Sequence, residues 1–356
     1  FEEAAKQGAS GAIIIHEESA AAYPWSVVEN SWLVPQLDLQ RKNLGEDRSI
    51  VEGWVPHNVF NDLISYTGFN YQSLVEIALD KTFRPFNLRG MSLSTEIYNE
   101  VEYFESHNVA AVKKGKSKPD EYILITAHWD HLGVLDNDDE DDNIANGAVD
   151  NATGIAALLE LATQFHNVDT ERSILFLTLT LEESGLLGSE YFAMYPPMPL
   201  NQIVAGFNFD GILPTGKTND MVVIGYGASD LEDMLEEVLI QEDRYINPDP
   251  NPEKGYFYRS DHISFAKRGV PMLYADGGVD LVNGGKQAGI KIEDDYRTVA
   301  YHGVSDEYDE SWDLEGLEQT IKTISKLINH LSNSEEWPNW YEGNEFRNVR
   351  DQSMNQ

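Results

Sequence analysis

The chain has 356 residues, of which 41% are hydrophobic and 11% aromatic, enough for one large domain or two ordinary ones with buried cores. Its 61 acidic and 25 basic residues give a formal net charge of −36, which excludes binding to nucleic acid or to an anionic membrane through clustered Lys and Arg. The absence of cysteine excludes disulfides and thiolate metal sites, so any metal must be bound by His, Asp and Glu.

The first part of the chain predicts short elements. Residues 1–16 read as a helix, a glycine turn and a strand, and residues 32–39 (WLVPQLDL) and 49–55 (SIVEGWV) read as strands. Residues 58–79 have helical spacing that is broken around Gly68. The chain opens without Met, so we expect an upstream portion. The sequence contains no run of about 18 apolar residues, so it predicts no transmembrane helix.

Strands alternate with helices in the rest of the chain. Residues 107–128 (HNVAAVKKGKSKPDEYILITAH) predict a hairpin of two apolar strands joined by a charged turn. Further strands are predicted at 174–181, 204–210, 221–227 and 270–276, and helices at 154–165, after Gly188, at 230–241 and at 314–331. A long loop is predicted between residue 276 and the last of these helices. This alternation predicts an α/β domain with a mostly parallel, mixed central sheet and helices on both of its faces.

The acidic tract DNDDEDD, residues 136–142, is the one low-complexity patch. We interpret it as a solvated loop. A calcium site is the alternative, because hard cations bind several carboxylates, although the tract lacks EF-hand spacing.

Acidic residues and histidines follow the predicted strands at the points where these end. His128 and Asp130 follow one strand, and Glu182 and Glu183 follow the next. Asp210 ends a third strand. Two adjacent carboxylates at the end of a core strand repel each other, so we expect a compensating positive charge nearby.

Two further segments supply donors of the same kind. Asp150 precedes the helix that begins near Gly154, and a late loop carries Tyr301 and His302. Taken singly, each donor is an ordinary polar residue. Taken together, five sites with nitrogen and oxygen donors and no sulfur predict a hydrolytic metal centre. The number of carboxylates suits two metal ions better than one.

These segments resemble one protein family. HWDHLG, NGAVDNATG, LEESGLLGSEYF, NFDG, RSDHISFAKRGVP and YHGVSDEYD recur in this order in the M28 family of di-zinc metallopeptidases. The resemblance covers residues 56–335, and residues 1–55 resemble the C-terminal part of a protease-associated domain. It implies two domains: residues 1–55, protease-associated-like, and residues 56–356, a zinc peptidase domain.

The resemblance implies a role for each motif residue. His128 and Asp210 would bind one zinc ion, Glu183 and His302 the other, and Asp150 would bridge the two. Further roles would fall to Glu182 as general base, Asp130 as the carboxylate that orients His128, Tyr301 as donor to the developing oxyanion, and Arg259 in substrate binding. His131 and His262 are interpreted as packing or polar neighbours of the site.

The resemblance also implies a backbone feature, a location and a class of substrate. Relatives have a cis peptide after the bridging aspartate, so we expect a cis bond between Asp150 and Asn151. Secretion or a periplasmic location is expected, as for many members of the family. Peptides are the expected substrates, and oligomeric state is left open.

The implied function is that of a di-zinc aminopeptidase, which cleaves N-terminal residues with a metal-activated water and a glutamate base. The excess of acid suits a substrate ammonium group. The alternatives are a carboxypeptidase or dipeptidase of the same fold, a non-enzymatic receptor-like relative, and a single-zinc glutaminyl cyclase. Lys and Arg that could receive a substrate carboxylate are few, with Arg259 and Lys217 the visible candidates. The preferred N-terminal residue is not indicated by the sequence.

Overall fold

The computed structural model describes residues 1–355 except 22–23, 33–34, 42–47, 89 and 136–141. The chain divides into two compact units, residues 1–104 and residues 105–356. The predicted boundary between residues 55 and 56 therefore falls inside the first unit. The question of calcium binding by the acidic tract concerns residues that lie almost wholly outside the described ones.

The first unit is built around two parallel strands, β1 and β2, which pair from Gly11 with Val51 to His16 with Pro56. Its elements are α1 (Glu2–Lys6), β1 (Gly11–His16), α2 (Glu18–Ala21), α3 (Trp25–Trp32), β2 (Val51–Pro56), α4 (His57–Ser65) and α5 (Tyr71–Ala78). The helix, strand and broken-helix predictions are confirmed. The strand predicted at 32–39 is wrong, because α3 extends to Trp32 and Pro35, which offers no backbone N–H, is followed by irregular chain.

The second unit contains a five-stranded sheet in the order β11-β8-β4-β7-β3. All neighbours in this sheet are parallel except β3, which runs antiparallel to β7. Its strands are β3 (Val109–Lys113), β4 (Lys118–His128), β7 (Arg172–Leu179), β8 (Ile203–Asn208) and β11 (Met272–Tyr274). Two short pairs lie outside it: β5 (Gly133–Val134) with β6 (Ile144–Ala145), and β9 (Asp220–Val223) with β10 (Tyr245–Pro248).

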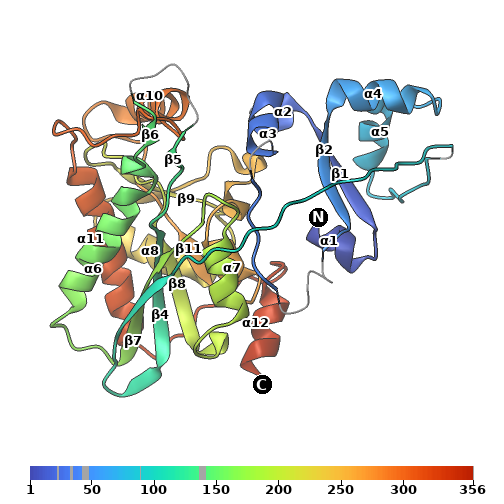
Figure 1. Cartoon of the computed structure of the whole chain (residues 1–356). Helices are drawn as coiled ribbons and strands as arrows, with labels where there is room; N and C mark the ends of the chain where they lie inside the picture. The colour runs from blue at the N-terminus through green and yellow to red at the C-terminus, as the bar shows by residue number, and fades with distance from the viewer. Residues whose placement is uncertain (22–23, 33–34, 42–47, 89, 136–141, 356) are drawn as a thin grey trace. The chain divides into compact units, whose positions relative to one another are not determined.

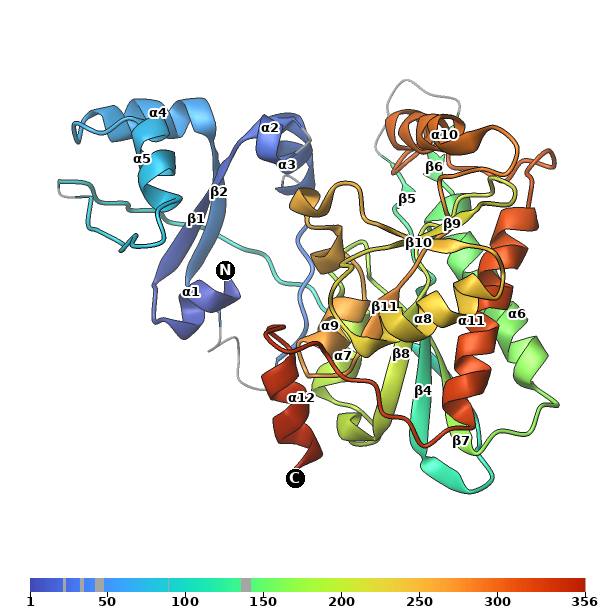
Figure 2. The same cartoon turned by 180° about the vertical axis from the view of Figure 1, so that it is seen from behind.

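Helices cover both faces of this sheet (Figures 1 and 2). Those that pack against its strands are α6 (Gly154–Phe165), α7 (Leu187–Met194), α8 (Asp230–Ile240), α9 (His262–Ala266) and α11 (Glu315–Ser332). The unit also contains α10 (Gly285–Val299) and α12 (Arg347–Met354). Successive residues of a strand point to opposite faces. Ile123 and Ile125 accordingly pack with the buried sides of α6, α8 and α11, whereas Leu124 packs with α7 and α9. The predicted α/β class, with a mostly parallel sheet flanked by helices, is confirmed.

Two predictions in this unit are wrong. Residues 107–128 form two strands, as predicted, but β3 and β4 are not a hairpin because β7 lies between them and pairs with both. The turn that joins β3 to β4 passes over the start of β7, where Lys116 donates its backbone N–H to the carbonyl of Thr170. The segment predicted as a long loop after residue 276 contains α10, whose one buried residue is Gly289. A helix with so little buried surface has no apolar stripe for the sequence to reveal.

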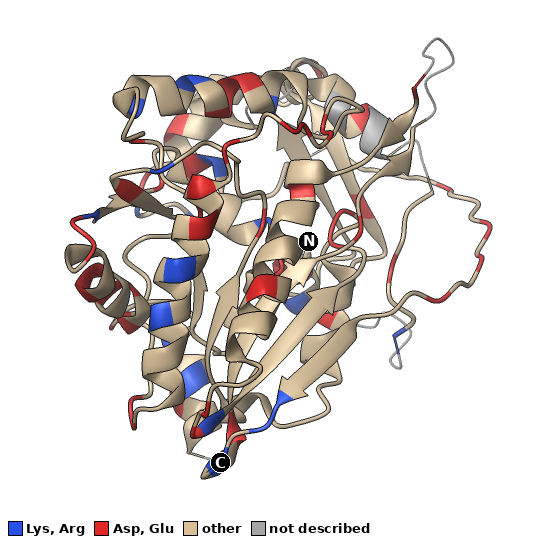
Figure 3. Ribbon diagram, turned by 90° about the vertical axis from the view of Figure 1, so that its left-hand side faces the viewer, with Lys and Arg blue, Asp and Glu red and all other residues tan. Residues whose placement is uncertain are grey.

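The charge distribution predicts a response to salt. Asp and Glu are spread over the helices and loops of the chain, with fewer Lys and Arg among them (Figure 3). Because the formal charge is −36, mutual repulsion should destabilise the folded state at low ionic strength. Screening shortens the reach of these charges to about 8 Å at physiological salt and about 3 Å at 1 M. We expect the melting temperature to rise between low salt and about 1 M NaCl.

The same titration checks a second consequence of the charge. The family resemblance implies a substrate with an ammonium group, whose attraction to acidic residues screening would also weaken, so we expect the apparent KM to rise with salt while stability increases. A melting temperature that stays flat or falls across this range would show that repulsion between the acidic groups does not destabilise the fold.

Candidate metal centre

The carboxyl ends of the parallel strands place the predicted donors together. His128 is the last residue of β4, Asp210 lies two residues beyond β8, and Glu182 and Glu183 follow β7. Leu181, with a φ of 55°, turns the chain between β7 and the two glutamates. In sheets of this kind, ligand-binding residues gather at this edge.

A fourth segment brings Asp150 to the same place. The turn Ala148–Thr153 precedes α6, and the peptide bond between Asp150 and Asn151 is cis, as predicted. Gly147, at a φ of 65°, opens this turn, and a Cβ there would lie 2.3 Å from the carbonyl oxygen of Asp150 and 2.5 Å from the ring of His131. This position therefore requires glycine.

The five predicted ligands form one cluster with Asp150 at its centre. Oδ1 of Asp150 lies 3.2 Å from Nε2 of His128, which is also 3.1 Å from Oδ1 of Asp210. Oδ2 of Asp150 lies 3.3 Å from Nε2 of His302, which is also 3.2 Å from Oε2 of Glu183. Each oxygen of Asp150 thus faces a different histidine and carboxylate pair.

Charge within the cluster is balanced by its histidines. Burial lowers the pKa of His302, but contacts with Asp150 and Glu183 outweigh it and raise this pKa to about 10. Burial likewise disfavours a charged His128, yet Asp210 and Asp150 hold the pKa of His128 well above its usual value. Burial raises the pKa of Asp150, but hydrogen bonds from both histidines depress it overall. The buried carboxylate of Asp150 and the half-buried carboxylates of Glu183 and Asp210 therefore require positive charge between them.

The donor set fits zinc. Imidazole nitrogens and carboxylate oxygens are ordinary zinc ligands. Donor atoms of His128, Asp150 and Glu183 all lie within 4.8 Å of one another, close enough to share an ion. A divalent cation would supply the positive charge between these carboxylates, in place of the protonated imidazoles of His128 and His302.

Asp130 connects two of these segments. Its carboxylate accepts the backbone N–H groups of Glu182, at 3.1 Å, and Glu183, at 3.3 Å. Nδ1 of His128 lies 3.0 Å from the backbone carbonyl of Asp130 and 3.9 Å from its carboxylate. The carbonyl is thus the nearer partner that orients the imidazole, and the carboxylate holds the pair of glutamates.

Glu182 is buried beside the cluster and makes none of its ion pairs among the described contacts. Burial raises the pKa of Glu182 well above its usual range, and the nearby carboxylate of Asp210 adds to the shift. A carboxyl group of raised pKa next to a ligand residue is typical of a group that takes up and returns protons.

Tyr301 and Arg259 lie around the cluster in different ways. The ring of Tyr301 stacks on that of His302 with centroids 3.9 Å apart, and 46% of the residue is exposed. Arg259 is exposed and its guanidinium lies 5.7 Å from the ring centroid of Tyr256. Its neighbour Ser260 donates a hydrogen bond to the carboxylate of Asp210, so the backbone links Arg259 to the cluster.

Three residues near the ligands were not predicted to bind metal or to take part in catalysis. Nδ1 of His131 lies 2.7 Å from Oε1 of Glu183, so His131 orients this carboxylate, in agreement with the interpretation of a polar neighbour. His262 is fully buried between the rings of Phe257 and Tyr274, as expected of a packing residue. Asp261 is also buried, and burial raises the pKa of Asp261 to about 7. Each of these residues lies inside one of the motifs that resemble the family, and this position was the signal in the sequence that they lie near the ligands.

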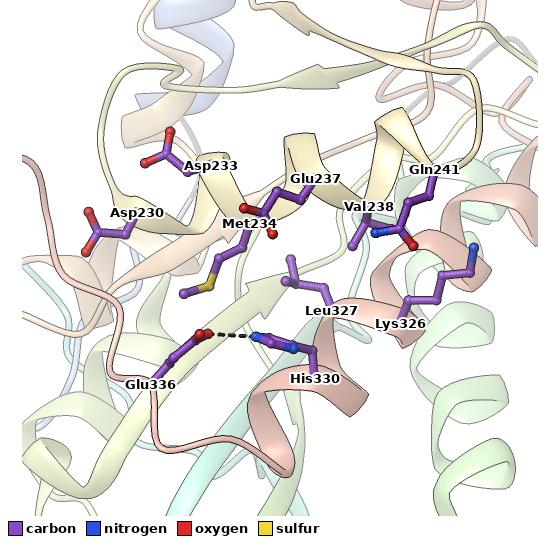
Figure 4. Close-up of a pocket in the computed structure, with 10 residues that line it drawn as sticks. All are labelled: Asp230, Asp233, Met234, Glu237, Val238, Gln241, Lys326, Leu327, His330 and Glu336. Carbon is purple, nitrogen blue, oxygen red and sulfur yellow. Dashed lines mark hydrogen bonds and ion pairs between the residues drawn. The ribbon is translucent and has the colours of Figure 1, made fainter.

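A cavity of about 550 Å³ between α8 and α11 lies apart from this cluster (Figure 4). It is lined by Asp230, Asp233, Met234, Glu237, Val238, Gln241, Lys326, Leu327, His330 and Glu336. None of these is a predicted site residue. Among these lining residues, Nε2 of His330 lies 2.6 Å from Oε2 of Glu336. The cavity is therefore separate from the metal centre.

Sequence comparisons place the chain in a family. The model of peptidase family M28 matches residues 108–328, more than half of the chain. A probable zinc metalloprotease of Pyrenophora teres f. teres is 36% identical over 102 residues, covering 29% of this chain and 22% of that protein. Aminopeptidase YwaD of Bacillus subtilis is 30% identical over 107 residues, covering 30% of this chain and 21% of that protein. The chain thus spans about a fifth of the length of either relative.

The fold has a counterpart among solved structures. An aminopeptidase from Aneurinibacillus sp. strain AM-1 is similar with a TM-score of 0.50 and 19% identity, covering 94% of this chain and 66% of that one. Within the described residues, no helix has both the length and the apolar character to cross a membrane. The family match begins at residue 108, and the likeness of residues 1–55 to a protease-associated domain stays a prediction. The family predicted from the motifs is confirmed: the chain belongs to peptidase family M28.

Proposed function

We propose that the chain is a zinc-dependent aminopeptidase, which holds two Zn²⁺ ions and removes N-terminal residues from peptides. The placement of Asp150 carries this proposal, because its two oxygens face two separate histidine and carboxylate pairs. His128 and Asp210 would hold one ion, Glu183 and His302 the other. Zinc bound in this way supplies a Lewis acid that polarises a peptide carbonyl and lowers the pKa of a coordinated water.

Glu182 performs the proton transfer in the proposed mechanism. Its carboxylate takes a proton from the attacking water and returns it to the nitrogen of the leaving amine. Burial raises the pKa of Glu182, which makes its carboxylate a stronger base for the first step, and the resulting acid can still donate to the more basic leaving amine. The backbone N–H of Glu182 donates a hydrogen bond to Asp130, which fixes the backbone from which the Glu182 side chain extends.

Tyr301 stabilises the negative charge that develops on the carbonyl oxygen. Partial burial of the phenol, in a residue that is 46% exposed overall, and the nearby carboxylate of Asp150 raise the pKa of Tyr301, so the hydroxyl keeps its proton and remains a donor. Stacking on His302 holds its ring beside the cluster.

Charge favours an N-terminal substrate group over a C-terminal one. The carboxylates of Asp210, Glu182 and Glu183 lie together, and an ammonium group is attracted to such a site. A second candidate, a carboxypeptidase, is supported by one observation: the guanidinium groups of Arg259 and Arg297 lie 5.7 and 4.7 Å from the ring centroid of Tyr256. Arg297 also pairs with Glu293 at 2.8 Å, which reduces the positive charge it can offer a substrate.

A panel of substrates tests the proposal. We expect aminoacyl-anilides with a free amine to be hydrolysed, peptides with a blocked N-terminus to be inert, and a chelator to abolish the activity. Hydrolysis of N-blocked peptides at their C-terminal residue would favour the carboxypeptidase instead. Hydrolysis that survives complete chelation would contradict a zinc-dependent enzyme.

A further inference from the structure

One buried carboxylate joins the turn of Asp150 to the loop of His302. Asp306, which is 1% exposed, lies four residues after His302. Its Oδ1 accepts the backbone N–H of Val149 at 2.8 Å, and its Oδ2 accepts that of Asp150 at 3.0 Å. Its own carbonyl accepts the backbone N–H of Ala148 at 3.1 Å. Three consecutive amides of the turn are therefore bound by a single residue.

Further contacts extend this connection. The hydroxyl of Tyr296, on α10, donates to Oδ2 of Asp306 at 3.2 Å. The ring of Tyr296 also packs edge-on against that of Tyr301, which stacks on His302. Asp306 thus contacts the turn of one proposed ligand directly and reaches the other through two aromatic rings.

The turn of Asp150 and the loop of His302 each need a fixed backbone conformation. His302 has a φ of 58°, in the left-handed region that residues with a Cβ adopt infrequently. Asp150 must direct its two oxygens at two different partners, so a small rotation of its backbone would misplace one of them. Groups that hydrogen-bond around metal ligands fix the orientation of those ligands and tune metal affinity.

We propose that Asp306 is a positioning residue, which fixes the carboxylate of Asp150 relative to the imidazole of His302 and thereby sets the zinc affinity of the site. This inference rests on the proposed function, because it assigns zinc to this cluster. Asp306 itself contacts the backbone of a ligand residue and not the ion or the substrate.

The substitution Asp306→Asn tests this role with almost no change of shape. The side-chain amide of asparagine has only one acceptor oxygen. Its NH₂ group would therefore face the backbone N–H of Val149 or Asp150, which now donates to a carboxylate oxygen of Asp306. We expect the variant to lose zinc at a chelator concentration about 10–100-fold lower than the wild type requires. The visible spectrum of the Co²⁺-substituted variant should change as well, because it reports the geometry of the ligands.

Asp309→Asn is the matched control. Asp309 lies on the same loop, is exposed, and accepts the backbone N–H of Ser311 at 2.7 Å, so its loss removes an equal charge without touching the turn of Asp150. It should retain zinc and give the cobalt spectrum of the wild type. Far-UV circular dichroism of all variants checks that the chain is folded.

The outcomes are distinguishable. Wild-type zinc retention and an unchanged cobalt spectrum in folded Asp306→Asn would overturn the role of Asp306. If that variant does not fold, Tyr296→Phe decides, because it removes one donor to Asp306 and should weaken zinc retention to a smaller degree; wild-type retention there would overturn the proposal. Failure of the wild-type chain itself to bind zinc would overturn the proposed function on which this inference rests.

Discussion

Replacing Glu182 by Gln should lower kcat by at least about 100-fold, the scale of the loss of a general base. Glutamine has nearly the same shape but cannot accept a proton from water at neutral pH. Glu182 takes no part in the ion pairs that join the five proposed ligands, so zinc content should stay close to that of the wild type. Steady-state kinetics on an aminoacyl-anilide and metal analysis of the same preparation check both parts.

Glu183→Gln is the matched control, since it changes the adjacent residue in the same way. Glu183 contacts His302 at 3.2 Å and His131 at 2.7 Å, so its substitution should reduce zinc occupancy as well as activity. Equal zinc loss and equal kinetics in the two variants would contradict the division of labour between a proton carrier and a metal ligand.

The candidate site could be predicted from the sequence because its parts are local. His128 is the last residue of an apolar strand, Glu183 and Asp210 lie just beyond two others, and parallel strands bring their carboxyl ends to one edge. Which residues are ligands was implied by the family resemblance, and the structure brings these residues together. The five donors come from five segments, but each segment carries its own short motif.

The parts that were missed depend on partners far away in the chain. The pairing of β3 with β7 is decided by a strand about 60 residues later, so local alternation suggested a hairpin with β4 instead. Asp306 binds backbone amides, and its partner Val149 is 157 positions away. A bond to a backbone amide leaves no sequence signal at the partner position, because every residue except proline offers the same N–H.

The remaining misassignment concerns exposure. The sequence of α10 is rich in charge, and its buried residue is a glycine, so neither an apolar stripe nor a strong cap indicated a helix. Yet α10 carries Tyr296, which contacts Asp306. A helix can therefore support a site through one hydrogen bond while showing almost no hydrophobic pattern.

The second large effect is expected at the bridge. Purified chain should hold close to two zinc ions, and Asp150→Asn should weaken the binding of both, because each carboxylate oxygen faces a different pair of ligands. His302→Ala should instead empty mainly the site that it shares with Glu183. Activity should fall to the background of chelated enzyme in Asp150→Asn.

Metal titration separates the two variants. Zinc content, measured as chelator concentration increases, should fall in one step in Asp150→Asn, and His302→Ala should retain about one ion per chain over a range where the wild type retains two. Asp142→Asn is the control. Asp142 is exposed and accepts the backbone N–H of Ile144, so this variant loses a charge outside the ion pairs of the cluster and should behave as the wild type does. A wild-type stoichiometry near one that does not increase on adding zinc would contradict the bridge. Loss of a single ion in Asp150→Asn would mean that its two oxygens do not serve two ions.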